Sequence, residues 1–96
     1  MSGIVNEIVE ERGKAYGHPS LNHQRTARFW HAYHLNGTLG YGRVGRFDVC
    51  FMNILQKIAR CQSPAGPSQD SLRDIQGYAE NILIMLKEDE EHAKAN

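Results

Sequence analysis

Apolar residues recur with the period of an α-helix in four separate stretches of this sequence, and glycine and proline residues separate these stretches. No stretch alternates apolar and polar residues for long enough to make a β-strand. The sequence therefore predicts an all-α fold, in the form of a compact four-helix domain. The expected helices span residues 2–12, 20–35 and 47–61, with Asp48 as a candidate cap of the third, and a fourth and longest helix starts at Ser68.

The fourth helix carries more apolar surface than one small domain can cover. The chain has 96 residues, so we expect a single domain over 1–96, which buries only about 60–65% of its unfolded surface. Residues 82–86 are apolar on almost every side of the helix, and such a helix is normally buried all round. We therefore expect a homo-oligomer, with a monomeric four-helix bundle as the alternative. The acidic residues 88–91 lie where the helix dipole disfavours them, so we expect 88–96 to fray.

Charge and hydropathy argue against several classes of function. The 11 Lys and Arg balance the 11 Asp and Glu, whereas non-specific DNA binding needs a surplus of positive charge. The longest apolar run has five residues, far fewer than the roughly 20 that cross a bilayer, and glutamates stand where a signal peptide is apolar. We therefore expect a cytoplasmic protein with no direct contact to DNA or membranes. Cys50 and Cys61 form no CxxC pair, and the histidines show no zinc-ligand spacing, so we expect reduced thiols.

A first group of candidate site residues lies on the third and fourth helices. Lys57 and Arg60 are three residues apart and share one helix face, and Asp70 and Asp74, four apart, share another. The two faces meet if the helices are antiparallel. The group is then either an inter-helix salt-bridge cluster or an anion site, in which the carboxylates orient the cations towards a phosphate.

A second group surrounds the start of the second helix. Gly17 permits a backbone conformation that other residues avoid, and with Tyr16 and His18 it forms a turn that leads into a helix N-terminus, where free N–H groups attract anions. Asn22 lies in the first turn and is a candidate to read a base or ribose edge. Tyr16 and Trp30 are candidates to stack on a base. The alternatives are an ordinary turn before a helix and aromatic residues of the core.

Metal binding and catalysis have weaker support. Glu7, Glu10 and Glu11 form an ExxE pattern on the first helix, and Asp70 and Asp74 add carboxylates elsewhere. Mg²⁺ needs only one or two carboxylates when a phosphate ligand supplies the other oxygens, but most such pairs are a solvated helix face. No Ser-His-Asp order, P-loop or GxGxxG pattern is present. We therefore predict no catalytic residue, no metal ligand and no required cofactor, with Mg²⁺ as the ion if the protein is a hydrolase.

Six short blocks of sequence form a recognisable pattern, at residues 11–13, 16–22, 27–33, 48–60, 70–75 and 77–79. Over about residues 8–80 they resemble a small bacteriophage and prophage family of unknown function, which is often described as similar to the MazG-like, all-α nucleoside triphosphate pyrophosphohydrolases. The resemblance implies nucleotide handling in the host cytoplasm, and its last block adds Tyr78 to the candidate site. MazG-like enzymes hold Mg²⁺ with ExxE on one helix and ExxD on the next. This chain departs from that pattern, because residues 48–60 contain no second carboxylate and Asp70 and Asp74 stand on the following helix.

The sequence-based hypothesis is a phage-type protein that binds or sequesters a nucleotide or nucleotide-derived signal, cyclic or linear, without turning it over, and so counters a host defence. One alternative is a Mg²⁺-dependent nucleoside triphosphate pyrophosphohydrolase. Another is a protein–protein adaptor that docks a host helix on the apolar fourth helix. The predicted ligand-binding residues are Tyr16, Gly17, His18, Asn22, Trp30, Lys57, Arg60, Asp70, Asp74 and Tyr78.

Overall fold

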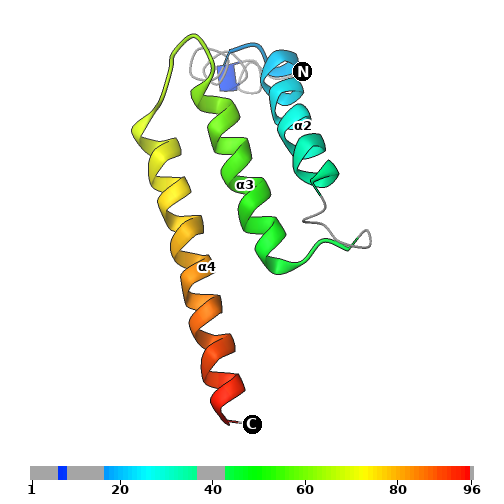
Figure 1. Ribbon diagram of the computed structural model, residues 1–96. Coiled ribbons are helices and arrows are strands. Elements are labelled where there is room, and N and C mark those ends of the chain that lie inside the picture. Colours follow the sequence, from blue (N-terminus) through cyan, green and yellow to red (C-terminus); the bar gives the residue numbers. More distant parts are fainter. Residues whose placement is uncertain (1–6, 9–16, 37–42, 96) are drawn as a thin grey trace.

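The computed structural model describes residues 7–8, 17–36 and 43–95. Within these ranges the chain forms three helices and no strand: α2 (Pro19–Leu35), α3 (Arg46–Cys61) and α4 (Gln69–Ala95) (Figure 1). The all-α prediction is confirmed. Of the expected first helix, Glu7 and Ile8 are helical and the rest lies outside the described residues, so the count of four helices stays a prediction.

Helix α2 begins where proline and histidine favour a helix start. Pro19 occupies the first turn, where its missing N–H costs nothing and its fixed φ suits a helix. His18 precedes it in extended conformation, and the Nδ1 atom of His18 accepts a hydrogen bond from the Ser20 backbone N–H at 3.2 Å. The helix therefore starts one residue before the predicted boundary and ends, as predicted, at Leu35.

The start of α3 corrects the role expected for Asp48. Gly45 is the residue that caps the helix, and Asp48 lies inside the first turn. The Asp48 carboxylate accepts a hydrogen bond from the Gly45 backbone N–H through Oδ2 at 2.8 Å, so it closes the turn from the third helical position. An acidic group near a helix N-terminus is also favoured by the helix dipole.

Helix α4 starts as the sequence predicted and runs further than expected. The Ser68 hydroxyl accepts a hydrogen bond from the Ser71 backbone N–H at 3.2 Å, which makes Ser68 the cap. At the other end the acidic run, where we expected fraying, is helical, and α4 continues to Ala95. The last turn contains Lys94, four residues after Glu90, and this order of opposite charges favours a helix.

The three helices form an open layer with α3 in the middle (Figure 1). Helix α3 packs extensively against α2 and against α4, while α2 and α4 have no comparable contact with each other. In the described part of the chain the buried hydrophobic residues are Cys50 and Ala59, both on α3, and no large side chain is fully buried. No further described helix covers the faces of this layer, in keeping with so small a core among the described residues.

The molecule is more extended than the compact domain that the sequence predicted. Its radius of gyration is 16.7 Å, whereas a compact domain of this length has about 12.5 Å. Helix α4 is the main reason, because its 27 residues span about 40 Å and the 16 residues of α3 only about 24 Å. The C-terminal part of α4 therefore extends beyond its neighbour (Figure 1).

Two partly buried hydrogen bonds join α2 to α3. The Trp30 ring N–H donates a hydrogen bond to the Met52 carbonyl at 2.7 Å, and the Tyr33 hydroxyl donates one to Asp48 Oδ1 at 2.6 Å. The Tyr33 ring also lies against Phe51, with 6.3 Å between the ring centroids. These contacts add to the limited apolar packing between the two short helices.

The Tyr33–Asp48 contact shifts the pKa values of both groups. The hydrogen bond from Tyr33, and after it the bond from the Gly45 N–H, lowers the pKa of Asp48, against an opposing effect of burial. Burial, followed by the hydrogen bond to Asp48 and its negative charge, raises the pKa of Tyr33 above its usual range. The folded state therefore favours a charged carboxylate next to a neutral phenol.

We expect Tyr33→Phe to lower the Tm at pH 7 by about 5 °C, because it removes one charge-assisted hydrogen bond. The lowered pKa of Asp48 stabilises the folded state above about pH 4, the pKa of an aspartate in the unfolded chain, and this stabilisation is lost as the pH falls. The raised pKa of Tyr33 stabilises the folded state below about pH 10, the pKa of a tyrosine in the unfolded chain, and this stabilisation is lost as the pH rises. On going from pH 7 to acidic or to alkaline pH, the Tm of Tyr33→Phe should therefore fall less than the Tm of the parent protein. Tyr78→Phe is the matched control, and an equal pH response in the parent and Tyr33→Phe proteins would contradict the assignment.

Candidate functional site

Several predicted site residues gather at one end of the layer, where α2 begins, α3 ends and α4 begins (Figure 1). Gly17 adopts a left-handed φ of 85°, which confirms the backbone role expected of this glycine. A Cβ atom on Gly17 would lie 3.6 Å from Pro64 and 3.8 Å from Ser63, so the turn before α2 packs against the loop between α3 and α4. Tyr16 lies outside the described residues.

The N-terminus of α2 offers less to an anion than we expected. The Ser20 N–H donates to the His18 ring, and the Leu21 and Asn22 N–H groups donate to the His18 carbonyl. His18 is exposed and its Nδ1 also lies 2.8 Å from the Ser20 hydroxyl oxygen. His18 therefore acts as a cap that uses the free N–H groups, and anion binding at this end has to come from side chains.

Asn22 is the most unusual polar residue of the site. It is only 7% exposed, and its Oδ1 atom has no hydrogen-bond partner. The Asn22 backbone carbonyl accepts a bond from the Thr26 hydroxyl at 3.2 Å, so the main chain is satisfied while the amide oxygen is not. A buried acceptor without a donor costs about 1–3 kcal/mol, which makes its presence in a small core unusual.

The antiparallel arrangement of α3 and α4 brings together part of the Lys/Arg/Asp group. The Lys57 ammonium lies 3.3 Å from the Asp74 carboxylate, and the Lys57 side chain is only 12% exposed. Asp70, one turn earlier, is exposed and has no partner in the part of the chain that the structure describes. Arg60 is half-buried and is engaged by another residue. The salt-bridge interpretation therefore holds for Lys57 and Asp74, and their role toward a ligand stays a prediction.

The two other predicted aromatic residues occupy packing positions. Trp30 lies between α2 and α3, where its N–H binds the Met52 carbonyl. Tyr78 is half-buried on α4. Because α2 and α4 lie on opposite sides of α3, the predicted set is divided: Trp30 is on one side and the Lys57–Asp74 pair on the other.

Sequence reasoning missed Arg25, which lies one turn after Asn22 on α2. Arg25 is half-buried, and its Nη1 atom is buried without a hydrogen-bond acceptor. A buried, charged donor without a partner is more costly than a neutral one. The sequence shows only that Arg25 belongs to a group of positive residues in the middle of the chain, and nothing in the pattern separates it from an exposed arginine.

The described residues contain no group of three or more His, Cys, Asp or Glu that could hold a metal ion. Of the candidate metal ligands on the first expected helix, Glu7 is described and exposed, while Glu10 and Glu11 lie outside the described residues. Both Cys50 and Cys61 are free thiols. None of the described helices has the length and apolar character needed to span a membrane.

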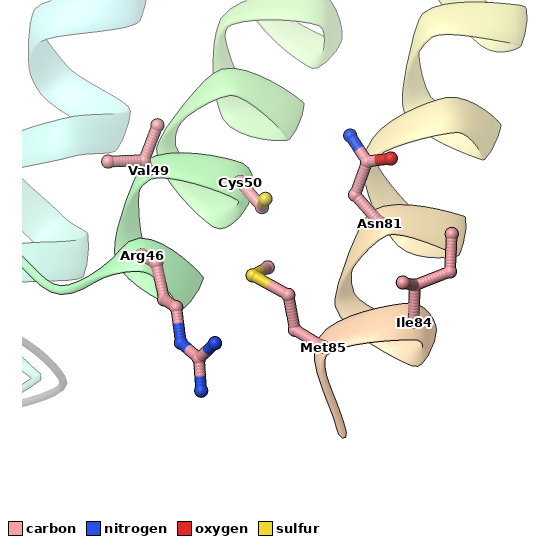
Figure 2. Close-up of a pocket in the computed structure, with 6 residues that line it drawn as sticks. All are labelled: Arg46, Val49, Cys50, Asn81, Ile84 and Met85. Atoms are coloured by element: carbon pink, nitrogen blue, oxygen red, sulfur yellow. The ribbon is translucent and has the colours of Figure 1, made fainter. Parts of the chain in front are cut away.

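A separate hollow of about 390 Å³ lies between α3 and α4, away from the predicted residues. Figure 2 shows the side chains of Cys50 and Met85 pointing towards one another from the two helices, with Val49 and Ile84 on its flanks. Arg46 stands at its edge and forms an ion pair with Asp89. The lining is mostly apolar and its one cationic side chain, Arg46, already has a carboxylate partner, so this hollow suits a side chain of a protein better than a phosphate.

The family model that matches this chain is described as a domain of unknown function (DUF6378), and it covers residues 3–84. The chain belongs to the DUF6378 family. The match confirms the expected membership of a family of unknown function and reaches slightly beyond the predicted 8–80. All three described helices of this DUF6378 protein fall in or begin in the matched range, and the end of α4 extends past it. No curated protein and no solved structure matches the chain.

The Lys57–Asp74 pair allows a direct measurement. We expect a double-mutant cycle with Lys57→Met and Asp74→Asn to give a coupling free energy below about 1 kcal/mol, because half of the Asp74 side chain is exposed to solvent. Urea unfolding of the four proteins measures it. Glu80→Gln, an exposed carboxylate on the same helix, is the control, and a coupling of several kcal/mol would show a buried pair instead.

Proposed function

We propose that this protein binds a phosphate-bearing, nucleotide-like small molecule at the end of the helical layer, and that it holds this molecule without chemical turnover. The observation that carries the proposal is the buried amide of Asn22, whose Oδ1 atom has no donor. A buried amide oxygen without a donor is available to a ligand that carries an N–H or O–H group.

The chemistry of Asn22 indicates which end of a ligand it binds. An amide oxygen accepts from N–H or O–H groups, which nucleobase edges and ribose hydroxyls carry and phosphates do not. Asn22 lies close to cationic side chains of the same end of the layer, because Arg25 follows it by one helical turn. A hydrogen-bond acceptor that suits a base or sugar, next to cations that suit a phosphate, is complementary to a nucleotide.

Binding without turnover is supported by the sequence and by the family resemblance. The chain contains none of the nucleophile or phosphate-loop patterns considered above. The resemblance of the sequence to a bacteriophage and prophage family would fit a sequestering role against a host defence nucleotide, because stoichiometric capture needs affinity and no catalytic group. We extend this role to the protein as part of the proposal.

We propose further that the working form is a homo-oligomer, in which a second copy of this chain covers an exposed apolar face of α4. Leu72, Leu83 and Leu86 are 49%, 59% and 46% exposed and, with Ala79, recur at helical spacing along one face. The molecule is too extended for a self-sufficient core, and its balanced charges present no net repulsion between copies.

We expect the protein to bind at least one member of a panel of linear and cyclic nucleotides, measured by titration calorimetry, and to return it intact with or without Mg²⁺. Asn22→Leu should abolish this binding and raise the stability of the free protein by up to about 2 kcal/mol, because an apolar group replaces an unsatisfied acceptor. Asn81→Leu on α4 is the matched control. Loss of stability in Asn22→Leu would show that Asn22 supports the fold, and Mg²⁺-dependent release of pyrophosphate would identify a hydrolase.

We expect Leu83→Glu to convert the oligomer to monomer in sedimentation velocity, because it places a charge in the centre of the exposed apolar face. Asn81→Glu introduces the same charge two residues away, about 200° around the helix, and should leave the oligomer intact. A parent protein that is monomeric at all concentrations would contradict self-association and favour a protein–protein adaptor.

A further inference from the structure

We propose that a groove on α2, lined by Arg25, Arg28, Phe29, Ala32 and Gln62, is the site that takes the phosphate of the ligand, with the aromatic ring of the ligand on Phe29. This inference rests on the proposed nucleotide-like ligand and moves its phosphate away from the Lys57 group to which the sequence assigned it. The chemical class of ligand is an aromatic molecule that carries one or more phosphates.

The shape of the groove suits part of a nucleotide. Its volume is about 350 Å³, at the lower end of the range for small-molecule sites. Arg25 and Arg28 are three residues apart and therefore share a face of α2, with the half-buried Phe29 beside them. Gln62, just after the end of α3, completes the lining from the neighbouring helix.

Arg25 has an unmet need for an acceptor. Its Nη1 atom is buried and no acceptor lies within hydrogen-bond distance. A guanidinium carries only donors and cannot lose its charge, so the missing partner has to be an oxygen with negative charge or a lone pair. Phosphate oxygens match the planar fork of an arginine in two-point contacts, which is the strongest form of this hydrogen bond.

The charges around the groove favour an anion there over one at Lys57. Lys57 already has the carboxylate of Asp74 at 3.3 Å, so an anion would have to displace it. Neither Arg25 nor Arg28 has a carboxylate partner within the part of the chain that the structure describes. Two like charges three residues apart on a helix repel each other, and a bound phosphate removes this repulsion.

The position of the groove agrees with the amide of Asn22. Asn22 and Arg25 are separated by about one helical turn, or about 5 Å along the axis. Phe29 and Asn22 lie on either side of Arg25 along α2, so a ligand that reaches both carries its phosphate between its aromatic ring and a hydroxyl or N–H group. Such a ligand satisfies Arg25 Nη1 and Asn22 Oδ1 together.

The test uses inorganic pyrophosphate and the nucleotide that binds best in the panel, each titrated into the full chain by calorimetry. We expect Arg25→Gln with Arg28→Gln to weaken binding of both probes about tenfold or more, because two charge-assisted contacts are lost. Arg73→Gln with Lys87→Gln removes the same net charge from exposed positions on α4 and should change affinity less than about twofold. Phe29→Leu should weaken the nucleotide and leave pyrophosphate unchanged.

The outcomes separate this inference from the proposed function. Pyrophosphate binding that depends on Arg25 and Arg28, with no nucleotide bound, supports the anion site and contradicts the nucleotide ligand. Nucleotide binding that the arginine double variant leaves intact, but that Lys57→Gln abolishes, overturns the groove and keeps the proposed function. If neither probe binds the parent protein, both are wrong. Should the double variant fail to fold, Arg28→Glu alone, at an exposed position, gives the same comparison.

Discussion

The structure depends on α3, which packs against α2 on one side and against α4 on the other and makes polar contacts with both. On one side Tyr33 and Trp30 of α2 donate hydrogen bonds to Asp48 and to the Met52 carbonyl. On the other side Lys57 and Arg46 are paired with carboxylates of α4. Polar contacts are directional and set the register of the helices, whereas apolar contacts between flat faces tolerate sliding. A layer with a small core therefore relies on them for a unique arrangement.

The same constraint explains why the two unsatisfied groups matter. In a large core, one buried acceptor without a donor is a small fraction of the total free energy of unfolding. In this layer the described buried hydrophobic residues are Cys50 and Ala59, so the cost of burying Asn22 Oδ1 and Arg25 Nη1 without a partner weighs more than it would in a large core. A ligand that completes both groups would thus stabilise the fold as well as occupy the site, which couples binding to stability.

The prediction of the helices succeeded where local signals were strong. The period of the apolar residues and the flanking glycine, proline and serine placed the starts of α2, α3 and α4 within one residue. Asp48 was assigned the wrong capping position, because an acidic residue stabilises a helix start from either the cap or the third position and the sequence does not distinguish the two. The dipole predicts fraying at the acidic end of α4, whereas the helix continues to Ala95 and its Asp89 is paired with Arg46 of α3, a long-range contact that the sequence does not show.

By itself, the sequence determined that this protein is helical, where its described helices lie, and that Gly17 takes a left-handed turn, because each of these follows from residues close together in the chain. The tertiary structure alone decided that α2 and α4 flank α3 as an open layer, that Lys57 meets Asp74, and that the Asn22 Oδ1 and Arg25 Nη1 atoms are buried without a hydrogen-bond partner. Burial and pairing depend on which faces of distant helices meet. Residue spacing along one helix limits those faces but does not choose among them.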